Sequence, residues 1–406
     1  MSRPDIAVTG LGMLTPAGIN AESTWKGVCD GEPTAATSGR LVGLPVDFCC
    51  SVPFFDAQES LGRRTVHRLD RSAQLALMAA KEALQDAALD TQAWDGTRVG
   101  VVIGSGMGAC QTWENQHRQL LDRPTRVSPL LISMIGPSTP ASEVALLCGA
   151  LGPTLVTATA CASGATAITV ARDLLITGQC DIVVAGGTEA SNTPLIATGF
   201  AQLGALSTRR NDPARASRPF DQARDGFVLG EAAAVLILER AEDAAARGHT
   251  PRALLAGCAS TTDAHHPTAP HPDGRGLKQA MRAALADAAL TPRDVDHVNA
   301  HGSSTVLNDA VEAQAISTVL PGGPFVTSTK GALGHSLGAT GAVEAALTVL
   351  TLQHCLIPPT ANLESPDPAF DLNLVVKAAA NEHLGVALSN SVGFGGHNVV
   401  LAFRTP

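Results

Sequence analysis

The chain has 406 residues, which is enough for two or three domains of ordinary size. Apolar residues make up 45% of it and charged residues 16%, a composition typical of a folded globular protein and not of a disordered one. The formal net charge of −9 argues against a nucleic-acid binder, and no apolar run approaches the roughly 20 residues that a membrane helix needs.

Short β-branched runs alternate with Ala-rich stretches along the chain. Residues 1–5 lead straight into such a run without a signal-peptide pattern, so we expect a cytoplasmic protein. The runs predict strands buried on both faces, and apolar residues at helical spacing predict helices between them, which together indicate a layered α/β fold. The predicted strands cover residues 5–9, 99–103, 181–185 and 398–402, and the predicted helices cover residues 72–88, 162–177, 276–289 and 341–352.

A change in composition near residue 250 indicates a boundary between two parts of the chain. The charged stretch 240–243 runs into a segment with Gly248 and Pro251, and a fresh apolar segment begins at Leu254. We therefore predict two domains, residues 1–250 and residues 251–406. No motif of one part aligns by eye with the other, so the sequence shows no internal repeat.

Residues 156–165 combine a buried-strand pattern, a group of small residues and a helical run, with Cys161 at the junction. We interpret this pattern as a nucleophile elbow, because small neighbours let the chain turn sharply. The N-terminus of the following helix would then favour the thiolate of Cys161. Small residues also surround many structural cysteines, and none of the nine cysteines has the Cys-x-x-Cys spacing of a zinc or redox site.

Two later stretches place histidines next to glycines and small residues. His301 ends a strand-like run and precedes small hydroxyl residues. Lys330 and His335 lie in a glycine-rich loop before the helix that carries Glu344. A nucleotide-binding loop is rejected there, because the Gly-x-x-x-x-Gly-Lys-Ser/Thr order is absent. Taken singly, each histidine would also suit a structural role in its loop.

In combination, these motifs resemble the elongating β-ketoacyl-[acyl carrier protein] synthases of the thiolase-like superfamily, close to type II polyketide ketosynthases. A cysteine at an elbow is followed by two histidine motifs and by a terminal Gly-Phe-Gly-Gly-His-Asn at residues 393–398. The likeness spans essentially the whole chain, and ordered matches this numerous are hard to obtain by chance. Further matching stretches are residues 8–12, 186–190, 217–221 and 224–231.

The resemblance implies four catalytic residues, Cys161, His301, His335 and Lys330, together with an oxyanion hole and a gate at Phe394. Cys161 would carry the acyl group, while His301 and His335 would stabilise the enolate that forms as a malonyl group loses carbon dioxide. The backbone N–H groups of Cys161 and Phe394 would form the oxyanion hole, and the Phe394 ring would gate access to the thiol. The implied reaction is a decarboxylative Claisen condensation, catalysed by an acyltransferase.

The resemblance also implies a structural and electrostatic role for Lys330, and three supporting residues, Glu344, Ser303 and Thr305. Lys330, with Glu344 nearby, would orient the His335 loop and set the protonation of the histidines. Ser303 would touch the phosphopantetheine arm, and Thr305 is a second supporting hydroxyl. No metal and no redox cofactor is implied, because the substrates are carried on the phosphopantetheine of an acyl carrier protein.

A fold and partners follow from the same resemblance. The fold would be α/β, five-layered α-β-α-β-α and made of two similar halves, with a dimer formed across an edge strand near residues 153–159. The partners would be an acyl carrier protein and either an identical subunit or a chain-length-factor-like one. A basic group aligns with the region that docks the carrier protein in the family, although a solvated helix face would look the same. Its members are Arg63, Arg64, His67, Arg68 and Arg71.

Departures from the family pattern leave the substrate range open. Ser303 stands where Thr is usual, Val306 replaces a frequent Pro, and residues 202–204 are also altered. Fatty-acid elongation and a type II polyketide or polyene pathway both remain possible readings. Two other classes are kept as alternatives: a non-catalytic chain-length factor, which would lack Cys161, and a biosynthetic thiolase, which would need a Cys after Cys355.

Overall fold

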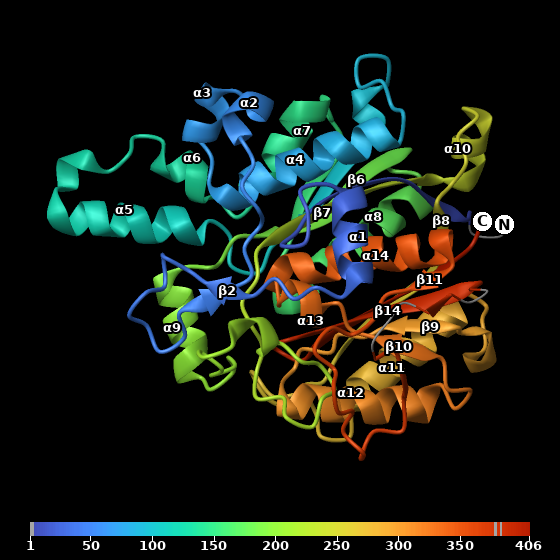
Figure 1. The fold of residues 1–406 in the computed structure, drawn as a ribbon. Helices are drawn as coiled ribbons and strands as arrows, with labels where there is room; N and C mark the ends of the chain where they lie inside the picture. Colours follow the sequence, from blue (N-terminus) through green and yellow to red (C-terminus); the bar gives the residue numbers. More distant parts are fainter. Residues whose placement is uncertain (1–3, 377–379, 382–383) are drawn as a thin grey trace.

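Within the described residues, a mixed sheet of eleven strands runs through the whole molecule (Figure 1). The computed structural model describes residues 4–376, 380–381 and 384–406. The strands of the first half are β1 (Ile6–Leu14), β4 (Val99–Gly104), β5 (Thr154–Thr157), β6 (Ile182–Glu189) and β7 (Ala232–Arg240). Those of the second half are β8 (Ala253–Thr262), β9 (His297–Asn299), β10 (Phe325–Thr327), β12 (Asn373–Leu374), β14 (Val386–Gly393) and β15 (His397–Arg404).

Five strands of each half of the sheet repeat the same arrangement, and β12 is an additional strand at the edge of the second half. In the first half, β1 is antiparallel to β7 and β7 to β6, while β6, β4 and β5 run parallel. In the second half, β8 is antiparallel to β15 and β15 to β14, while β14, β9 and β10 run parallel. A short antiparallel pairing of β1 with β8 joins the halves. The boundary expected near residue 250 lies between α10 (Ala241–Ala246) and β8, and its role as a domain boundary stays a prediction.

Helices on both faces of each half-sheet give five layers (Figure 1). On one outer face lie α4 (Arg71–Asp86) and α7 (Thr139–Cys148), and on the other lie α11 (Arg275–Asp287) and α12 (Val306–Val319). Between the half-sheets, α8 (Ser163–Ile176) packs against α14 (Thr340–His354). The predicted α-β-α-β-α architecture with two similar halves is therefore confirmed.

The central helices approach closely because each carries a glycine at the contact. A Cβ on Gly164 of α8 would lie 2.7 Å from the backbone nitrogen of Ala342, and one on Gly341 of α14 would lie 2.7 Å from that of Ala165. Residues 340–352 of α14 are all buried, as a helix between two sheets must be. This packing brings the start of both helices to one place in the core.

The predicted strands and helices are confirmed, with small differences at their ends. The strands predicted from apolar runs lie in β1, β4, β6 and β15, and β4 is buried along its whole length. The prediction that the strand before Cys161 is buried is wrong, because β5 is the last strand of its half-sheet and is partly exposed. No helix among the described residues is both long and apolar enough to cross a membrane.

Shorter elements connect the layers and carry the surface loops. An arm formed by α5 and α6 extends away from the body of the molecule (Figure 1). The helices are α1 (Ala21–Asp30), α2 (Ala57–Leu61), α3 (Arg63–His67), α5 (Cys110–Asp122), α6 (Leu131–Ile135), α9 (Pro194–Gln202) and α13 (Lys330–Leu333). The short strands are β2 (Ala36–Thr37), β3 (Phe48–Cys49), β11 (Leu356–Ile357) and β13 (Ala380–Asn381).

Candidate active site

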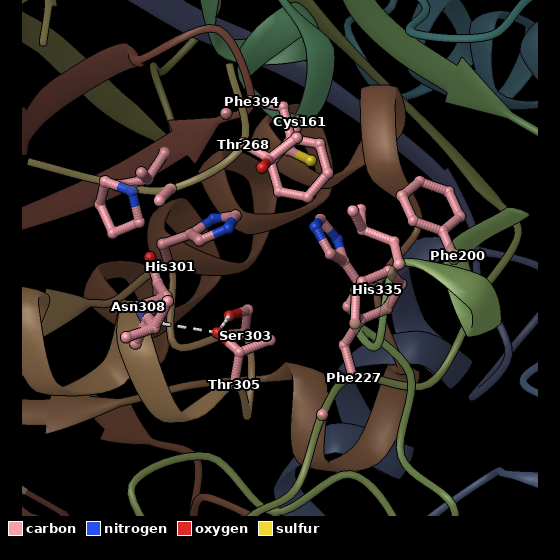
Figure 2. Close-up of a pocket in the computed structure, with 18 of the residues that line it drawn as sticks. Cys161, Phe200, Phe227, Thr268, His301, Ser303, Thr305, Asn308, His335 and Phe394 are labelled. Carbon is pink, nitrogen blue, oxygen red and sulfur yellow. Dashed lines mark hydrogen bonds between the residues drawn. The ribbon is translucent and has the colours of Figure 1, made fainter. Parts of the chain in front are cut away.

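A pocket with a volume of about 280 Å³ brings together Cys161, His301 and His335 from both halves of the chain (Figure 2). Cys161 follows β5 and His301 follows β9, so both lie at the carboxyl ends of parallel strands, where open α/β sheets bind their ligands. All three side chains are at least nine-tenths buried. The structure therefore assembles the three residues that the sequence singled out separately.

Cys161 lies in a tight turn between β5 and α8. Ala160 has a φ of +49°, in the left-handed region that a residue with a Cβ rarely adopts. Residues 160–162 form a 3-10 turn that leads directly into α8. A Cβ on Gly393 would lie 3.2 Å from the backbone nitrogen of Cys161, so the end of β14 packs closely on the same turn. This is the geometry that the elbow interpretation predicted.

The protonation of Cys161 differs from the expectation. Burial raises the pKa of the Cys161 thiol to about 12, although the Lys330 cation and the backbone N–H of Phe394 act in the opposite direction. The resting pocket therefore holds a neutral thiol and not the thiolate that we expected from the helix N-terminus. The N–H groups of Phe394 and of Cys161 itself both approach the sulfur, where an oxyanion hole requires them.

The two imidazoles face each other across the pocket. Their ring centroids are 5.2 Å apart and their planes are inclined by 79°. Figure 2 shows both rings on either side of the cavity, with the Cys161 sulfur and the Phe394 ring at one end. Burial lowers the pKa of His301 and of His335 well below the usual range, and the Lys330 cation lowers both further. Both histidines are therefore neutral.

Hydrogen-bond partners determine which nitrogen of each ring carries the proton. Nδ1 of His335 accepts the backbone N–H of Leu337 at 3.3 Å and lies 3.0 Å from the Thr340 hydroxyl. Nδ1 of His301 lies 3.5 Å from Nζ of Lys330, and an ammonium group can only donate. Because Nδ1 is an acceptor in both rings, each Nε2 carries the hydrogen and is a donor.

Lys330 is a buried structural cation. Its Nζ donates to the carboxylate of Glu344 and to the backbone carbonyl of His301. Burial raises the pKa of Glu344 to about 8, and the adjacent Lys330 lowers it in part. We expected Lys330 to orient the His335 loop. The structure instead places its ammonium group against the loop of His301, although Lys330 precedes His335 in the chain.

Two buried carboxylates that the sequence analysis missed hold the loop of His301. Glu312 accepts the backbone N–H of His301 at 2.8 Å and that of Gly302 at 2.7 Å. Asp309 accepts the N–H of Ser304 at 3.2 Å. The two carboxylates are three residues apart on α12, which is about one turn of helix. Acidic side chains at that spacing directly after the histidine motif were therefore a usable sequence signal for these two residues.

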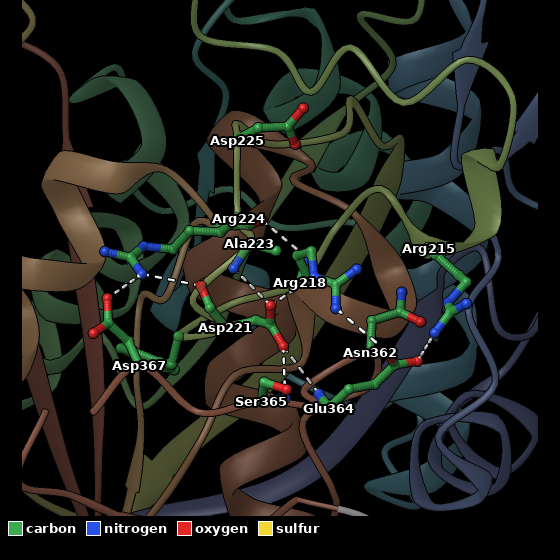
Figure 3. A network of polar contacts seen from close by, with 12 residues as sticks. Arg215, Arg218, Asp221, Ala223, Arg224, Asp225, Asn362, Glu364, Ser365 and Asp367 are labelled. Atoms are coloured by element: carbon green, nitrogen blue, oxygen red, sulfur yellow. Dashed lines mark hydrogen bonds and ion pairs between the residues drawn. The ribbon is translucent and has the colours of Figure 1, made fainter. Parts of the chain in front are cut away.

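Ser303 and Thr305 lie together in the pocket lining, with their hydroxyls 2.9 Å apart. Arg224 holds the backbone next to them, since its guanidinium donates to the carbonyls of Thr305 and Val306 at 3.4 and 3.3 Å. Arg224 is held in turn by Asp367 at 2.8 Å (Figure 3). This polar network connects the wall of the pocket to segments that are far away in the sequence.

Aromatic rings form one side of the pocket. The Phe394 ring lies 6.3 Å from that of Phe200, which meets Phe227 edge-on at 5.3 Å. Phe227 in turn lies 5.2 Å from the His335 ring. Of the three phenylalanine rings, only that of Phe394 was predicted from the sequence. The other two become recognisable as lining residues only when the fold brings α9 and the segment before β7 to the pocket.

The expected docking group is only partly free. Arg68 forms a two-pronged ion pair with Glu143 of α7, and Arg71 is paired with Glu231. The exposed members are Arg63, Arg64 and His67, which lie on α3. These three are the residues of the group that remain available to a partner, and their role in docking stays a prediction.

Comparisons with known sequences agree with the geometry of this site. The family model described as "Beta-ketoacyl synthase, N-terminal domain" matches residues 3–244, and "Beta-ketoacyl synthase, C-terminal domain" matches residues 252–364. A protein of Synechocystis sp. named 3-oxoacyl-[acyl-carrier-protein] synthase 2 is 42% identical over 100% of this chain and 99% of its own. A protein of the same name from Staphylococcus aureus is 40% identical over 98% of both chains.

Solved structures with the same fold include two that contain a ketosynthase. One is a type II polyketide synthase acyl carrier protein in complex with its ketosynthase bound to the hexaketide. The match has a TM-score of 0.92 and 32% identity, and covers both chains completely. Another is the ishigamide ketosynthase/chain length factor, with a TM-score of 0.94, 30% identity and complete coverage of both chains.

Proposed function

The chain belongs to the β-ketoacyl synthase family, and we propose that it joins an acyl group on Cys161 to a malonyl unit by decarboxylative Claisen condensation. The observation that carries this proposal is the convergence of a thiol and two neutral imidazoles in one buried pocket. Both substrates arrive on the phosphopantetheine arm of an acyl carrier protein, and Ser303 and Thr305 contact that arm.

In the first half-reaction, the Cys161 sulfur attacks the carbonyl carbon of an acyl thioester. The backbone N–H groups of Cys161 and Phe394 donate to the oxygen that becomes negative in the tetrahedral intermediate. The carbon–sulfur bond to phosphopantetheine then breaks, and the departing sulfur receives the proton that Cys161 loses. One thioester is exchanged for another, so no energy source is required.

In the second half-reaction, a malonyl thioester loses carbon dioxide and negative charge develops on its thioester oxygen. Nε2–H of His301 and Nε2–H of His335 donate to this oxygen, and two aimed donors in a water-poor pocket lower the barrier. The enolate carbon attacks the acyl carbon on Cys161. The Cys161 thiolate leaves and takes a proton from solvent, which restores the resting enzyme.

The proposed chemistry uses no metal and no redox cofactor, because the thiol and the two imidazoles supply all the groups that it needs. A chain-length factor without a nucleophile and a thiolase are both less suited to a chain that carries Cys161 and belongs to this family. We keep the cytoplasm as its expected location.

The partners that we propose are an acyl carrier protein and a second subunit of the same fold. Structures of similar proteins include a complex with an acyl carrier protein and a ketosynthase with its chain length factor. β5 is the partly exposed edge of the first half-sheet, and Leu155 on it is 41% exposed. We propose that the subunits pair along this edge, either as a homodimer or with a chain-length-factor-like subunit.

Intact-mass spectrometry tests the function and identifies the pathway. The protein is incubated with carrier proteins loaded with short, long or polyenoyl chains, alone and with a candidate partner subunit. We expect a mass gain equal to one acyl group, absent in Cys161→Ala. A preference for saturated chains indicates type II fatty-acid synthesis, and one for polyenoyl or polyketide chains indicates type II polyketide or polyene synthesis. No acylation with any chain or partner would contradict the proposal.

A further inference from the structure

Glu189 is a buried carboxylate behind the nucleophile that the proposed chemistry does not use. It is the last residue of β6 and has no exposed surface. We propose that Glu189 is a positioning residue: it forms a clamp, with Gly106, Met107 and Gly338, that holds two loops against the turn of Cys161. This inference rests on the proposed function, because it assigns a role within the same site.

The Glu189 carboxylate accepts from groups of three chain segments. Oε2 accepts the backbone N–H groups of Gly106 at 2.7 Å, Met107 at 3.1 Å and Gly338 at 3.3 Å. Oε1 accepts the hydroxyls of Ser105 at 3.4 Å and Ser191 at 3.1 Å. All five donors are uncharged, so the carboxylate acts here as a junction of hydrogen bonds and not as half of an ion pair.

The segments meet closely at two glycines, and a side chain at Gly338 would overlap its neighbours. A Cβ on Gly338 would lie 2.7 Å from Oε2 of Glu189 and 2.8 Å from the carbonyl carbon of Ser105. A Cβ on Gly106 would lie 3.1 Å from the same Oε2 and 3.4 Å from the carbonyl oxygen of Ala160. The loop after β4, the His335 loop and the elbow of Cys161 are therefore packed around one carboxylate.

The residues of the clamp lie next to residues that position the groups of both half-reactions. Gly338 follows Leu337, which has a φ of +45° and whose N–H donates to Nδ1 of His335. A shift of Gly338 would move the donor that keeps Nε2–H of His335 in the pocket. On the other side, the loop at Gly106 packs against Ala160, whose left-handed turn presents Cys161. The clamp therefore keeps the enolate donor and the nucleophile in a fixed relation.

The geometry of the clamp requires acceptor oxygens more than a negative charge. Burial raises the pKa of Glu189 to about 7 despite its donors, so near neutral pH the group is protonated part of the time. A protonated carboxyl keeps one oxygen for the three N–H groups and donates from the other to a serine hydroxyl. Glutamine has the same pattern, because its amide oxygen accepts and its NH2 group donates. Alanine leaves three N–H groups without this acceptor, of which that of Gly338 is buried and those of Gly106 and Met107 are partly buried.

Single-turnover kinetics and hydrogen exchange test this proposal with Glu189→Ala, Glu189→Gln and Glu189→Asp. Cys161 is first loaded with an acyl group, verified by intact mass, and malonyl carrier protein is then added so that condensation is timed separately from acyl transfer. We expect E189A to slow condensation about tenfold to hundredfold, the effect of losing buried hydrogen bonds. We expect E189Q to stay within about threefold of wild type, since it preserves the same bonds.

Amide hydrogen exchange measures how firmly the clamp holds its two loops, independently of activity. We expect E189A to exchange faster in segments 104–109 and 335–340 together, and E189Q to match wild type. E189D, with a shorter side chain, serves if E189A does not fold, and the same two segments are expected to loosen. The matched control is Glu82→Ala, since Glu82 accepts the backbone N–H groups of Met13 and Ala21 at 2.8 and 2.7 Å, away from the pocket.

The outcomes distinguish this proposal from the proposed function. Unchanged exchange at residues 335–340 in both E189A and E189D overturns the clamp, as does an E189Q variant that is as slow in condensation as E189A. Wild-type protein that never condenses overturns the proposed function but leaves the exchange measurement valid. An E82A variant that shows the same two loosened segments would also overturn the clamp, because the effect would then reflect general destabilisation.

Discussion

At the level of single residues, the two proposed half-reactions use different hydrogen-bond donors. In the proposed chemistry, acyl transfer uses the backbone N–H groups of Cys161 and Phe394, whereas decarboxylation uses the side chains of His301 and His335. Backbone donors are fixed by the elbow and by Gly393, so no side-chain substitution at the histidines removes them. The two half-reactions should therefore respond differently to substitution.

Replacement of either histidine tests this separation. We expect His301→Ala and His335→Ala each to slow condensation by about 100-fold to 1000-fold, the usual effect of losing one oxyanion donor. Acyl transfer to Cys161 should change by less than about tenfold, because its donors remain. Rapid-quench mass spectrometry of both steps measures the difference. Equal losses in both steps would show that the histidines also serve the nucleophile.

Lys330 adds to the effect of burial on the pH range of the site through its charge. Burial and then the Lys330 cation lower the pKa values of His301 and His335, so both rings stay neutral in moderately acidic solution. In Lys330→Met the second contribution is lost and both pKa values rise. Burial already raises the pKa of Glu344 to about 8 and the loss of Lys330 raises it further, so Glu344 is protonated in this variant and no buried charge is stranded.

We expect the acid limb of the condensation pH profile to move upward by about one pH unit or more in K330M. Protonation of His335 impairs the site, because a proton on Nδ1 would repel the N–H of Leu337 and disturb the ring. A raised pKa of His335 therefore moves the acid limb to higher pH. The pH dependence of kcat measures the shift. The matched control is Lys81→Met, since Lys81 donates to the carbonyl of Ser60 outside the pocket. A profile that does not move in K330M would contradict the electrostatic role.

At the level of elements, the pair α8 and α14 determines how Cys161 and the His335 loop approach each other. Both helices begin next to the pocket, and Gly164 and Gly341 allow their backbones to touch. We expect Gly341→Ala to lower the free energy of unfolding by about 1–3 kcal/mol, because the new methyl group overpacks this contact. Thermal and denaturant unfolding measure the change.

Gly199 provides the control for the same substitution. It is an exposed glycine in α9, and a Cβ there would meet nothing within 4 Å. Gly199→Ala should therefore be neutral or stabilise the protein by up to about 1 kcal/mol, the ordinary gain of Ala over Gly in a helix. Destabilisation of similar size in both variants would mean that helix packing in the central layer is not the cause.

The same elements show which features of the fold apolar periodicity can predict and which it cannot. Apolar spacing predicted α4, α8, α11 and α14 because it reports local burial, and it predicted strands such as β4 for the same reason. It failed for β5, whose exposure depends on having no further strand beside it in this chain. Glu312 was missed although its spacing from the histidine motif was a usable signal. Glu189 was missed because its partners at Gly106 and Gly338 come from distant segments, and no local pattern records such contacts.

At the level of the whole molecule, the site lies where two repeated halves meet. The first half supplies Cys161, and the second supplies His301, Lys330 and His335. The motifs and their family resemblance identified these residues and their grouping. The strand-for-strand repeat itself was not visible, because a sheet topology is preserved by pairing and burial and does not need matching side chains.

The distribution of charge over the molecule gives a final prediction about its partner. The chain carries a formal net charge of −9, yet α3 exposes Arg63, Arg64 and His67 together. Acyl carrier proteins are typically acidic, so long-range repulsion from the whole chain would oppose docking unless this local patch attracts them. Arg68 contributes less, because Glu143 already neutralises it.

We expect Arg63→Glu with Arg64→Glu to raise KM for acyl carrier protein about tenfold at low salt, with a smaller change in kcat. The effect should shrink as salt is added, since exposed charges are screened beyond a distance of about 10 Å at 0.1 M ionic strength. The control is Arg282→Glu on α11, an exposed arginine in the opposite outer layer. An unchanged KM in the double variant, or an equal rise in the control, would show that the carrier protein docks elsewhere.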